Sequence, residues 1–228
     1  MSRDELKKAA AQRAVEYLQD GMVVGLGSGS TASYATLAIA QRLRQGTLRD
    51  IVAIPTSEET ATLARREGIP LVDLDDRPAI DVTIDGADEV DPQLNVIKGL
   101  GGFLLREKIV AYATRREIIV VDDSKLVTQL GTLSPVPVEV VRFGWQHTRE
   151  ALINTGAQVS QRMTRDGAPF ITDEGHYIID CRYPGIAAPH DLVATLNAIP
   201  GVVDNGLFLD IVQLVVIASQ TETRIMER

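Results

Sequence analysis

The chain has 228 residues, of which 45% are hydrophobic and 24% are charged, and its formal net charge is −8 at pH 7. A chain of this size and composition can bury a sizeable core, which excludes a disordered or fibrous protein. The net negative charge argues against a nucleic-acid surface, because such surfaces depend on clustered lysine and arginine, but it allows a small anionic substrate in a locally basic pocket.

The first part of the chain alternates helix and strand patterns. Ser2 and Glu5 form a capping box at the start of a helix that the apolar spacing predicts over 3–19. Residues 22–26 are a short apolar run that ends in glycines, which indicates a strand, and 31–43 has the spacing of a helix. The order is therefore strand, glycine-rich turn, helix.

The same alternation continues to about residue 121. The sequence predicts strands and helices in turn, with strands over 51–54, 71–74, 80–84 and 118–121 and helices over 57–67 and 103–114. Alternation of this kind is typical of a parallel sheet with helices on both faces and right-handed crossovers. We predict an α/β fold with a doubly wound, mainly parallel, Rossmann-like sheet.

The pattern changes near residue 130, where prolines frame an extended segment. Strands and helices are expected in a new order, with strands over 136–141, 159–163 and 177–180 and helices over 146–154 and 190–198. This order is typical of a smaller α+β lobe of the split βαβ, ferredoxin-like type. The last apolar run, 207–217, is expected to return to the main sheet. The predicted domains are therefore a Rossmann-like catalytic domain, 1–130 plus 205–228, and a small α+β lobe, 131–204.

Cysteine usage and the N-terminal residues predict a cytoplasmic protein. Cys181 is the only cysteine, so no disulfide forms within the chain, and we interpret it as a small, partly buried apolar residue. Residues 1–8 carry charges where a signal peptide needs an apolar core, and no apolar run is long enough to span a membrane. We expect no membrane partner.

Polar loops directly follow four of the predicted strands: 27–31, 56–59, 85–89 and 122–125. In open parallel sheets, ligands bind beyond the carboxyl ends of the strands, so these loops are expected along one edge. The 27–31 loop precedes a helix N-terminus, where free backbone N–H groups and the helix dipole favour an anion such as phosphate. Taken alone, this loop is explained equally well by a tight structural turn, and it matches neither the dinucleotide fingerprint nor the P-loop.

Charged residues gather in the loops that follow. Asp85, Asp88 and Glu89 place three carboxylates within five residues, which is unfavourable unless cations or substrate hydroxyls offset the repulsion; a solvated acidic turn is the alternative. The 98–102 segment supplies a lysine and a glycine-rich backbone that a ligand can approach closely. Helix statistics alone favour Glu107 as a simple stabilising charge near a helix N-terminus. Its place after these loops favours a role in the site.

Five ordered motifs, taken together, closely resemble those of ribose-5-phosphate isomerase of the A type: 27–32, 85–89, 98–102, 105–109 and 123–125. The resemblance continues through three further segments, 135–140, 199–203 and 206–208, so it spans nearly the whole chain. Two positions depart from the family pattern, since Leu100 stands where glycine is common and Phe103 where a small residue is usual. Both are expected to reshape the pocket wall without removing a reactive group.

The resemblance implies an aldose–ketose isomerase that interconverts ribose 5-phosphate and ribulose 5-phosphate in the non-oxidative pentose phosphate pathway. It implies Glu107 as the proton acceptor, with Asp85, Asp88 and Lys98 as the other catalytic residues. The substrate-binding residues that it implies are Ser28, Gly29, Ser30, Thr31, Asp85, Gly86, Ala87, Asp88, Lys98, Gly99, Leu100, Gly101 and Lys125. It also implies a homodimer or homotetramer.

The implied chemistry needs few groups. An aldose becomes a ketose when a proton moves between adjacent carbons through an enediolate, so Glu107 would take the C2 proton and return it to C1. Lys98 would stabilise the developing oxyanion, and Asp85 or Asp88 would help to open the furanose ring. No redox change occurs, and the three histidines lack the paired spacing of metal ligands, so we expect neither an organic cofactor nor a metal.

Two other functions stay open at this point. A non-catalytic sugar-phosphate sensor could be built on the same sheet, since a fold does not fix a function, although Glu107 favours catalysis. An acyl or CoA transferase on a related fold would instead use Glu107 as a nucleophile. A covalent acyl adduct on Glu107 would distinguish the transferase from the isomerase.

Overall fold

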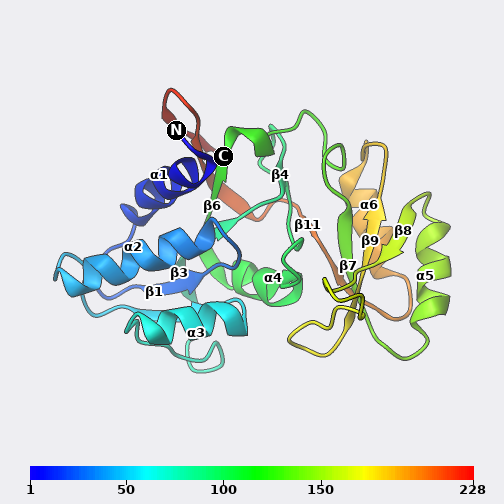
Figure 1. Cartoon of the computed structure of the whole chain (residues 1–228), viewed down its shortest axis with the longest axis horizontal. Helices are drawn as coiled ribbons and strands as arrows, with labels where there is room; N and C mark the ends of the chain where they lie inside the picture. The colour runs from blue at the N-terminus through cyan, green and yellow to red at the C-terminus, as the bar shows by residue number, and fades with distance from the viewer. The chain divides into compact units, whose positions relative to one another are not determined.

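The computed structural model describes residues 1–228, which divide into two compact units (Figure 1). Unit 1 comprises Met1–Ala87, Arg106–Lys125 and Asp210–Arg228, and unit 2 comprises Asp88–Leu105 and Leu126–Leu209. The units differ from the predicted domains mainly at residues 88–105, which we had assigned to the first domain. These residues form two short strands that pair within unit 2, and this pairing is the reason for the difference.

Unit 1 is built on a six-stranded sheet with the order β13-β12-β6-β3-β1-β2. Its strands are β1 (Val23–Leu26), β2 (Val52–Pro55), β3 (Ile80–Gly86), β6 (Thr114–Asp122), β12 (Val212–Ala218) and β13 (Thr223–Glu227). All neighbouring strands run parallel except β12 and β13. Valine and isoleucine dominate these strands because their branched side chains suit a buried pleated sheet. The predicted α/β fold with a mainly parallel sheet is confirmed.

Helices α1 (Arg3–Val15) and α2 (Ala32–Arg44) pack against each other and share one apolar core with the sheet (Figure 1). Ala10 and Ala11 of α1 are completely buried, and their small size lets the helix approach the strands closely. Each large aliphatic side chain in this core contributes roughly 1.5–3 kcal/mol relative to an exposed one. Helix α1 ends before the predicted residue 19, because residues 16–18 form the tighter hydrogen bonds of turns.

Two shorter helices, α3 (Glu58–Arg66) and α4 (Leu104–Tyr112), follow β2 and precede β6 respectively. The predicted strand over 71–74 is wrong, because this segment makes only one isolated bridge, from Leu71 to Ala53. Asp73 ends the extended segment by accepting a hydrogen bond from the backbone of Asp75, which is a turn typical of aspartate.

The strand order reverses between β1 and β3. From β1 the chain moves outward to β2, returns past β1 to β3, and then continues through β6 to β12. The loops that follow β1 and β3 therefore lie side by side at the carboxyl edge of the sheet. Ligands bind at this reversal in sheets of this order, so the topology itself selects these two loops as a candidate site.

Unit 2 contains a four-stranded antiparallel sheet with the order β10-β7-β9-β8 and two helices. Its elements follow the chain as β7 (Val136–Val140), α5 (Trp145–Ile153), β8 (Gln158–Gln161), β9 (Tyr177–Arg182), α6 (Pro189–Asn197) and β10 (Val202–Asn205). This is the predicted split βαβ lobe, with β10 as a strand that the sequence pattern missed. Its core joins β7 and β9 to both helices through residues such as Leu152 and Leu196.

A small three-stranded sheet completes unit 2, in the order β11-β5-β4. Its strands are β4 (Glu89–Val90), β5 (Val96–Ile97) and β11 (Leu207–Phe208). The predicted single run over 207–217 is therefore two strands, β11 and β12, because Asp210 between them has a positive φ of 60° and interrupts the extended chain. None of the helices in either unit is long and apolar enough to cross a membrane.

Candidate active site

The β1–α2 loop and the end of β3 form one backbone cluster in unit 1. The Gly27 N–H donates to the Ile84 carbonyl over 3.0 Å, and the Ser28 N–H donates to Asp85 Oδ1 over 3.1 Å. A Cβ atom on Gly27 would lie 2.2 Å from Asp85 Oδ1, so any larger residue would collide with that carboxylate. The glycine is required here by the close approach of Asp85, and the two predicted loops are in direct contact.

Three buried hydroxyl groups outside the β1–α2 loop contact its Ser28 hydroxyl. The Ser28 hydroxyl lies 2.7 Å from Thr56 Oγ1, 2.7 Å from Ser57 Oγ and 3.0 Å from Thr60 Oγ1. Ser57 is also the N-cap of α3, where it accepts the Thr60 N–H. Ser28 is only 7% exposed, so its hydroxyl acts inside the protein and fixes the loop. The assignment of Ser28 to the substrate-binding loop stays a prediction, and its hydroxyl also has this internal role.

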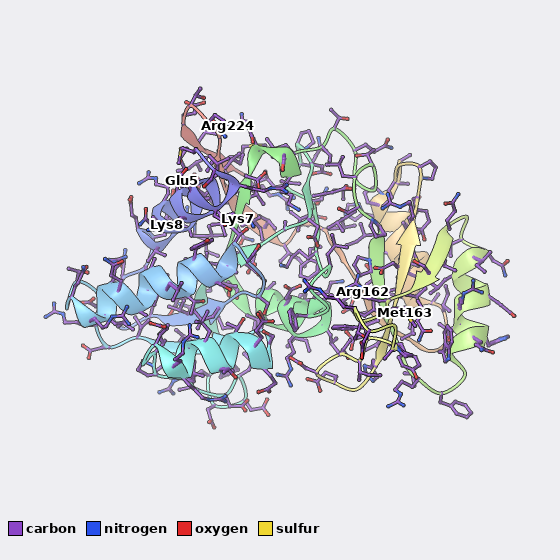
Figure 2. All side chains as sticks on the ribbon, in the orientation of Figure 1. Glu5, Lys7, Lys8, Arg162, Met163 and Arg224 are labelled. Carbon is purple, nitrogen blue, oxygen red and sulfur yellow. The ribbon has the colours of Figure 1, made fainter.

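Ser30 and Thr31 are the more accessible hydroxyls of the same loop, directly ahead of α2. The Lys7 ammonium on α1 donates to Ser30 Oγ over 2.9 Å, which brings a cation to the loop (Figure 2). Lys7 also lies 3.7 Å from Asp4, and its side chain is 17% exposed. A helix N-terminus with two hydroxyls and an ammonium group suits a phosphate. Sequence reasoning missed Lys7, because nothing in the pattern of α1 says which loop its polar face meets.

Asp85 ends β3 and is 1% exposed. Its Oδ1 atom accepts hydrogen bonds from the backbone N–H groups of Ser28 and Gly86, over 3.1 and 2.7 Å. A buried carboxylate is costly without such donors, so its presence at the strand reversal marks a candidate functional group. Gly86 lies close to Thr31: a Cβ atom added to Gly86 would be 4.0 Å from the Cβ atom of Thr31.

Glu107 lies in the first turn of α4 and is 5% exposed. The neighbouring Arg106 side chain forms an ion pair with Glu58, with 2.9 Å between Nη1 and Oε1. The hydrogen bond and the charge of Arg106 lower the pKa of Glu58. Glu107 is a buried glutamate, of the kind that can serve as a general base.

Lys125 ends a 3₁₀ turn, η1 (Asp123–Lys125), which directly follows β6 at the same carboxyl edge of the sheet. Asp122 anchors this turn by accepting the Ser124 N–H over 3.0 Å and lies 3.6 Å from Arg3 of α1. Burial opposes ionisation of Asp122, but hydrogen bonds from Ser124 and the charges of Arg3 and Lys125 outweigh it and lower its pKa.

The other predicted loop, Lys98–Gly102, belongs to unit 2. Lys98 is 2% exposed, and its ammonium lies 5.6 Å from the centre of the Phe208 ring, within the range of a cation–π contact. The Asp88 carboxylate accepts the Leu100 N–H over 3.0 Å. The Leu100 side chain is 40% exposed, so its departure from glycine adds apolar surface next to this loop.

Glu89 does not share the role of its two acidic neighbours. Its carboxylate is completely buried in unit 2 and accepts backbone N–H groups from Gly131, Leu133 and Ser134. These three hydrogen bonds tie the carboxylate to the backbone, so Glu89 holds the 131–134 turn. The predicted trio of carboxylates is thereby separated into one structural residue and two candidates for the site.

The three histidines all lie in unit 2. His176 Nδ1 lies 2.9 Å from Glu139 Oε1, which also accepts the Thr172 hydroxyl over 2.9 Å. No group of three or more histidine, cysteine, aspartate or glutamate side chains in the chain is arranged to hold a metal ion.

Comparison with known proteins gives consistent matches over the whole chain. Residues 52–222 match the model of the family ribose 5-phosphate isomerase A (phosphoriboisomerase A). The ribose-5-phosphate isomerase A of Gloeobacter violaceus is 55% identical over 221 residues, covering 96% of this chain and 95% of that protein, and that of Chloroflexus aurantiacus is 54% identical over 208 residues, covering 91% and 87%.

Solved structures give the same result. A D-ribose-5-phosphate isomerase in complex with phospho-erythronic acid is 43% identical with a TM-score of 0.98, covering 100% of both chains. A ribose 5-phosphate isomerase A from Methanocaldococcus jannaschii is 38% identical with a TM-score of 0.95, again over 100% of both chains.

Proposed function

Because the chain belongs to the ribose 5-phosphate isomerase A family, we propose that it interconverts ribose 5-phosphate and ribulose 5-phosphate by moving a proton between C1 and C2. The observation that carries the proposed mechanism is Glu107, a carboxylate only 5% exposed in the first turn of α4. A carboxylate held out of bulk water is suited to accept a proton from one carbon and to return it to the neighbouring carbon.

Glu107 takes the proton from C2 of the open-chain aldose, and the electron pair of the C–H bond forms the enediolate double bond between C1 and C2. The protonated Glu107 then returns the proton to C1. In the same sequence the C2 hydroxyl loses its proton and O1 gains one, so the ketose forms without any redox change. Lys98 stabilises the negative charge that develops on oxygen, because a preorganised ammonium needs little reorganisation during the reaction.

Asp85 and Asp88 handle the hydroxyl protons, including the one that moves when the furanose ring opens. Two backbone N–H groups already fix the orientation of Asp85, and one fixes that of Asp88. The phosphate group is bound by the N-terminus of α2, with Ser30 and Thr31 as hydroxyl donors. Lys7 and Lys125 supply positive charge to this group. The phospho-erythronic acid in the solved relative carries a phosphate and hydroxyls of the same kind, which supports this assignment.

The wider setting is proposed on the same basis. The enzyme acts in the cytoplasm, in the non-oxidative pentose phosphate pathway, as a homodimer or homotetramer. Cys181 is a free, buried thiol whose pKa is raised to about 12 by burial and by the charge of Asp180, so it takes no part in this chemistry.

The test is conversion of ribose 5-phosphate to ribulose 5-phosphate by the purified protein in EDTA. The wild type is expected to turn over, and Glu107→Gln is expected to lose about 10²–10⁴-fold in kcat, the usual contribution of a general base. Glu59→Gln, an exposed glutamate on α3, is the matched control and should keep full activity. Tight binding of ribose 5-phosphate without any wild-type turnover would contradict the proposal.

A further inference from the structure

Arg162 contacts the Lys98–Gly102 loop from the end of β8, and both belong to unit 2 (Figure 2). Its Nη1 atom donates to the Gly99 carbonyl over 2.7 Å and to the Leu100 carbonyl over 2.9 Å. The Arg162 side chain is 11% exposed, and its bond to the Gly99 carbonyl is partly buried. One guanidinium group therefore holds two successive carbonyls of the loop.

Asp180 of β9 fixes the guanidinium from its other edge. Arg162 Nε donates to Asp180 Oδ2 over 3.0 Å, and Nη2 pairs with Oδ1 in the second contact of a two-point ion pair. The planar guanidinium can make both contacts at once, which an ammonium group cannot do. The side chain is thus oriented before any ligand binds.

Because peptide bonds are planar, the contacts that Arg162 makes with the two carbonyls also set the directions of the Leu100 and Gly101 N–H groups. In a trans peptide the carbonyl of one residue and the N–H of the next point to opposite sides. The Gly99 carbonyl faces Arg162, and the Leu100 N–H accordingly points the other way, to Asp88. By the same rule the Gly101 N–H points away from the Leu100 carbonyl that Arg162 holds. Gly101 is exposed, and no atom of the chain accepts this N–H.

Phe170 packs against the same loop from the hairpin that joins β8 to β9. A Cβ atom on Gly102 would lie 2.3 Å from the Phe170 ring, so the glycine allows the ring to approach the backbone directly. The hairpin therefore supports the loop through one apolar contact and one charged contact.

We propose that Arg162 is a positioning residue for the isomerisation, which holds the Lys98–Gly102 loop so that the Gly101 N–H is directed at a substrate oxygen beside Asp88. Arg162 touches no reacting atom in this assignment. It acts through the carbonyls of Gly99 and Leu100, and Asp180 acts through Arg162. This inference rests on the proposed function, because it needs the loop to bind the substrate.

The test compares kcat and KM of Arg162→Ala and Arg162→Lys with those of the wild type. Arg162→Ala should lose about 100-fold in kcat/KM, mostly in kcat, as expected when catalytic groups are displaced by about an ångström. Arg162→Lys keeps the positive charge but not the planar guanidinium that makes both contacts, so its kcat/KM should be little higher than that of Arg162→Ala. A low, non-denaturing concentration of guanidinium should restore part of the activity of Arg162→Ala and none to Arg165→Gln. Arg165 is an exposed arginine of the same hairpin, so Arg165→Gln should remain close to wild type.

Asp180→Asn provides a second route if Arg162→Ala does not fold. Its loss should be smaller, and the double variant Arg162→Lys/Asp180→Asn should be little worse than Arg162→Lys, because the two residues act in series. Wild-type turnover with both Arg162→Lys and Asp180→Asn close to wild-type kcat would overturn the inference. Failure of the wild type to turn over would overturn the proposed function instead, so the two failures are distinguishable.

Discussion

The two glycine-rich loops of the molecule are held in place by different forces. The Gly27–Thr31 loop of unit 1 contacts neutral hydroxyl groups and the adjacent strand β3. Asp85 of this strand accepts a hydrogen bond from the backbone N–H of Ser28. The Lys98–Gly102 loop of unit 2 is held by charged groups, Asp88 on one side and Arg162 on the other. One loop is part of the sheet topology, and the other depends on a hairpin some sixty residues further along the chain.

This difference teaches what kind of change each loop tolerates. The loop in unit 1 has no room for a side chain at Gly27, because a Cβ atom there would collide with the Asp85 carboxylate, so the loop should be sensitive to volume at this position. The loop in unit 2 is also tight at Gly102, against the Phe170 ring, but it is in addition oriented by hydrogen bonds to charged groups, so it should be sensitive to charge and to hydrogen-bond geometry as well.

The largest effect on this comparison is expected from Gly27→Ala. The added Cβ would lie 2.2 Å from Asp85 Oδ1 and must displace either the loop or the carboxylate, so kcat/KM should fall by about 100-fold or more. Gly46→Ala is the control for activity, since its Cβ meets nothing within 4 Å and only its positive φ is strained. Steady-state kinetics on both variants decide the point; equal activity of the two would contradict the role assigned to Gly27.

A smaller effect separates the two serines of the same loop. Ser28→Ala removes the hydroxyl that Thr56, Ser57 and Thr60 share as a hydrogen-bond partner. The free energy of unfolding should therefore fall by about 1–3 kcal/mol. Ser30→Ala removes an exposed hydroxyl and should raise KM while leaving stability nearly unchanged. Denaturant unfolding measures the stability of each variant, and steady-state kinetics measure its KM. A large KM change in Ser28→Ala without any loss of stability would show that its hydroxyl contacts substrate.

The smallest effect concerns the hairpin of unit 2 and its dependence on pH. Burial raises the pKa of Glu139 above the ordinary 4.5, although hydrogen bonds from His176 and Thr172 oppose the shift. The folded state therefore holds this proton more tightly than the unfolded state, so the stability gained from it is present at low pH and lost as pH rises through the raised pKa. The free energy of unfolding of the wild type minus that of Glu139→Gln should therefore decline as pH rises above 4.5. A difference that grows with pH would contradict this sign.

Much of the fold could be predicted from local patterns. Apolar runs of β-branched residues located β1, β3 and β6, and the change of pattern near residue 130 located the ferredoxin-like lobe. The short strands β4, β5 and β10 were missed, because segments of two to four residues carry too little pattern. The 71–74 segment had the composition of a strand, but the aspartates that follow turn the chain instead.

The candidate site could be predicted only where its residues follow strands. Asp85 lies at the end of β3, and Ser28 and Lys125 follow β1 and β6 within three residues, so the topology alone places them at one edge. Lys7 and Arg162 could not be found in this way. Each reaches its loop from a helix or hairpin distant in sequence, and only tertiary packing shows which loop it meets.

The most direct test of the central claim is solvent exchange during turnover in D₂O, followed by NMR. If the Glu107 carboxylate carries the proton between C2 and C1 and exchanges it with water in part, the wild type should place deuterium at C1 of ribulose 5-phosphate, and Glu107→Gln should bind ribose 5-phosphate without isomerising it or exchanging its C2 proton. Continued exchange at C2 in Glu107→Gln, at a rate near that of the wild type, would contradict the assignment of Glu107 as the base.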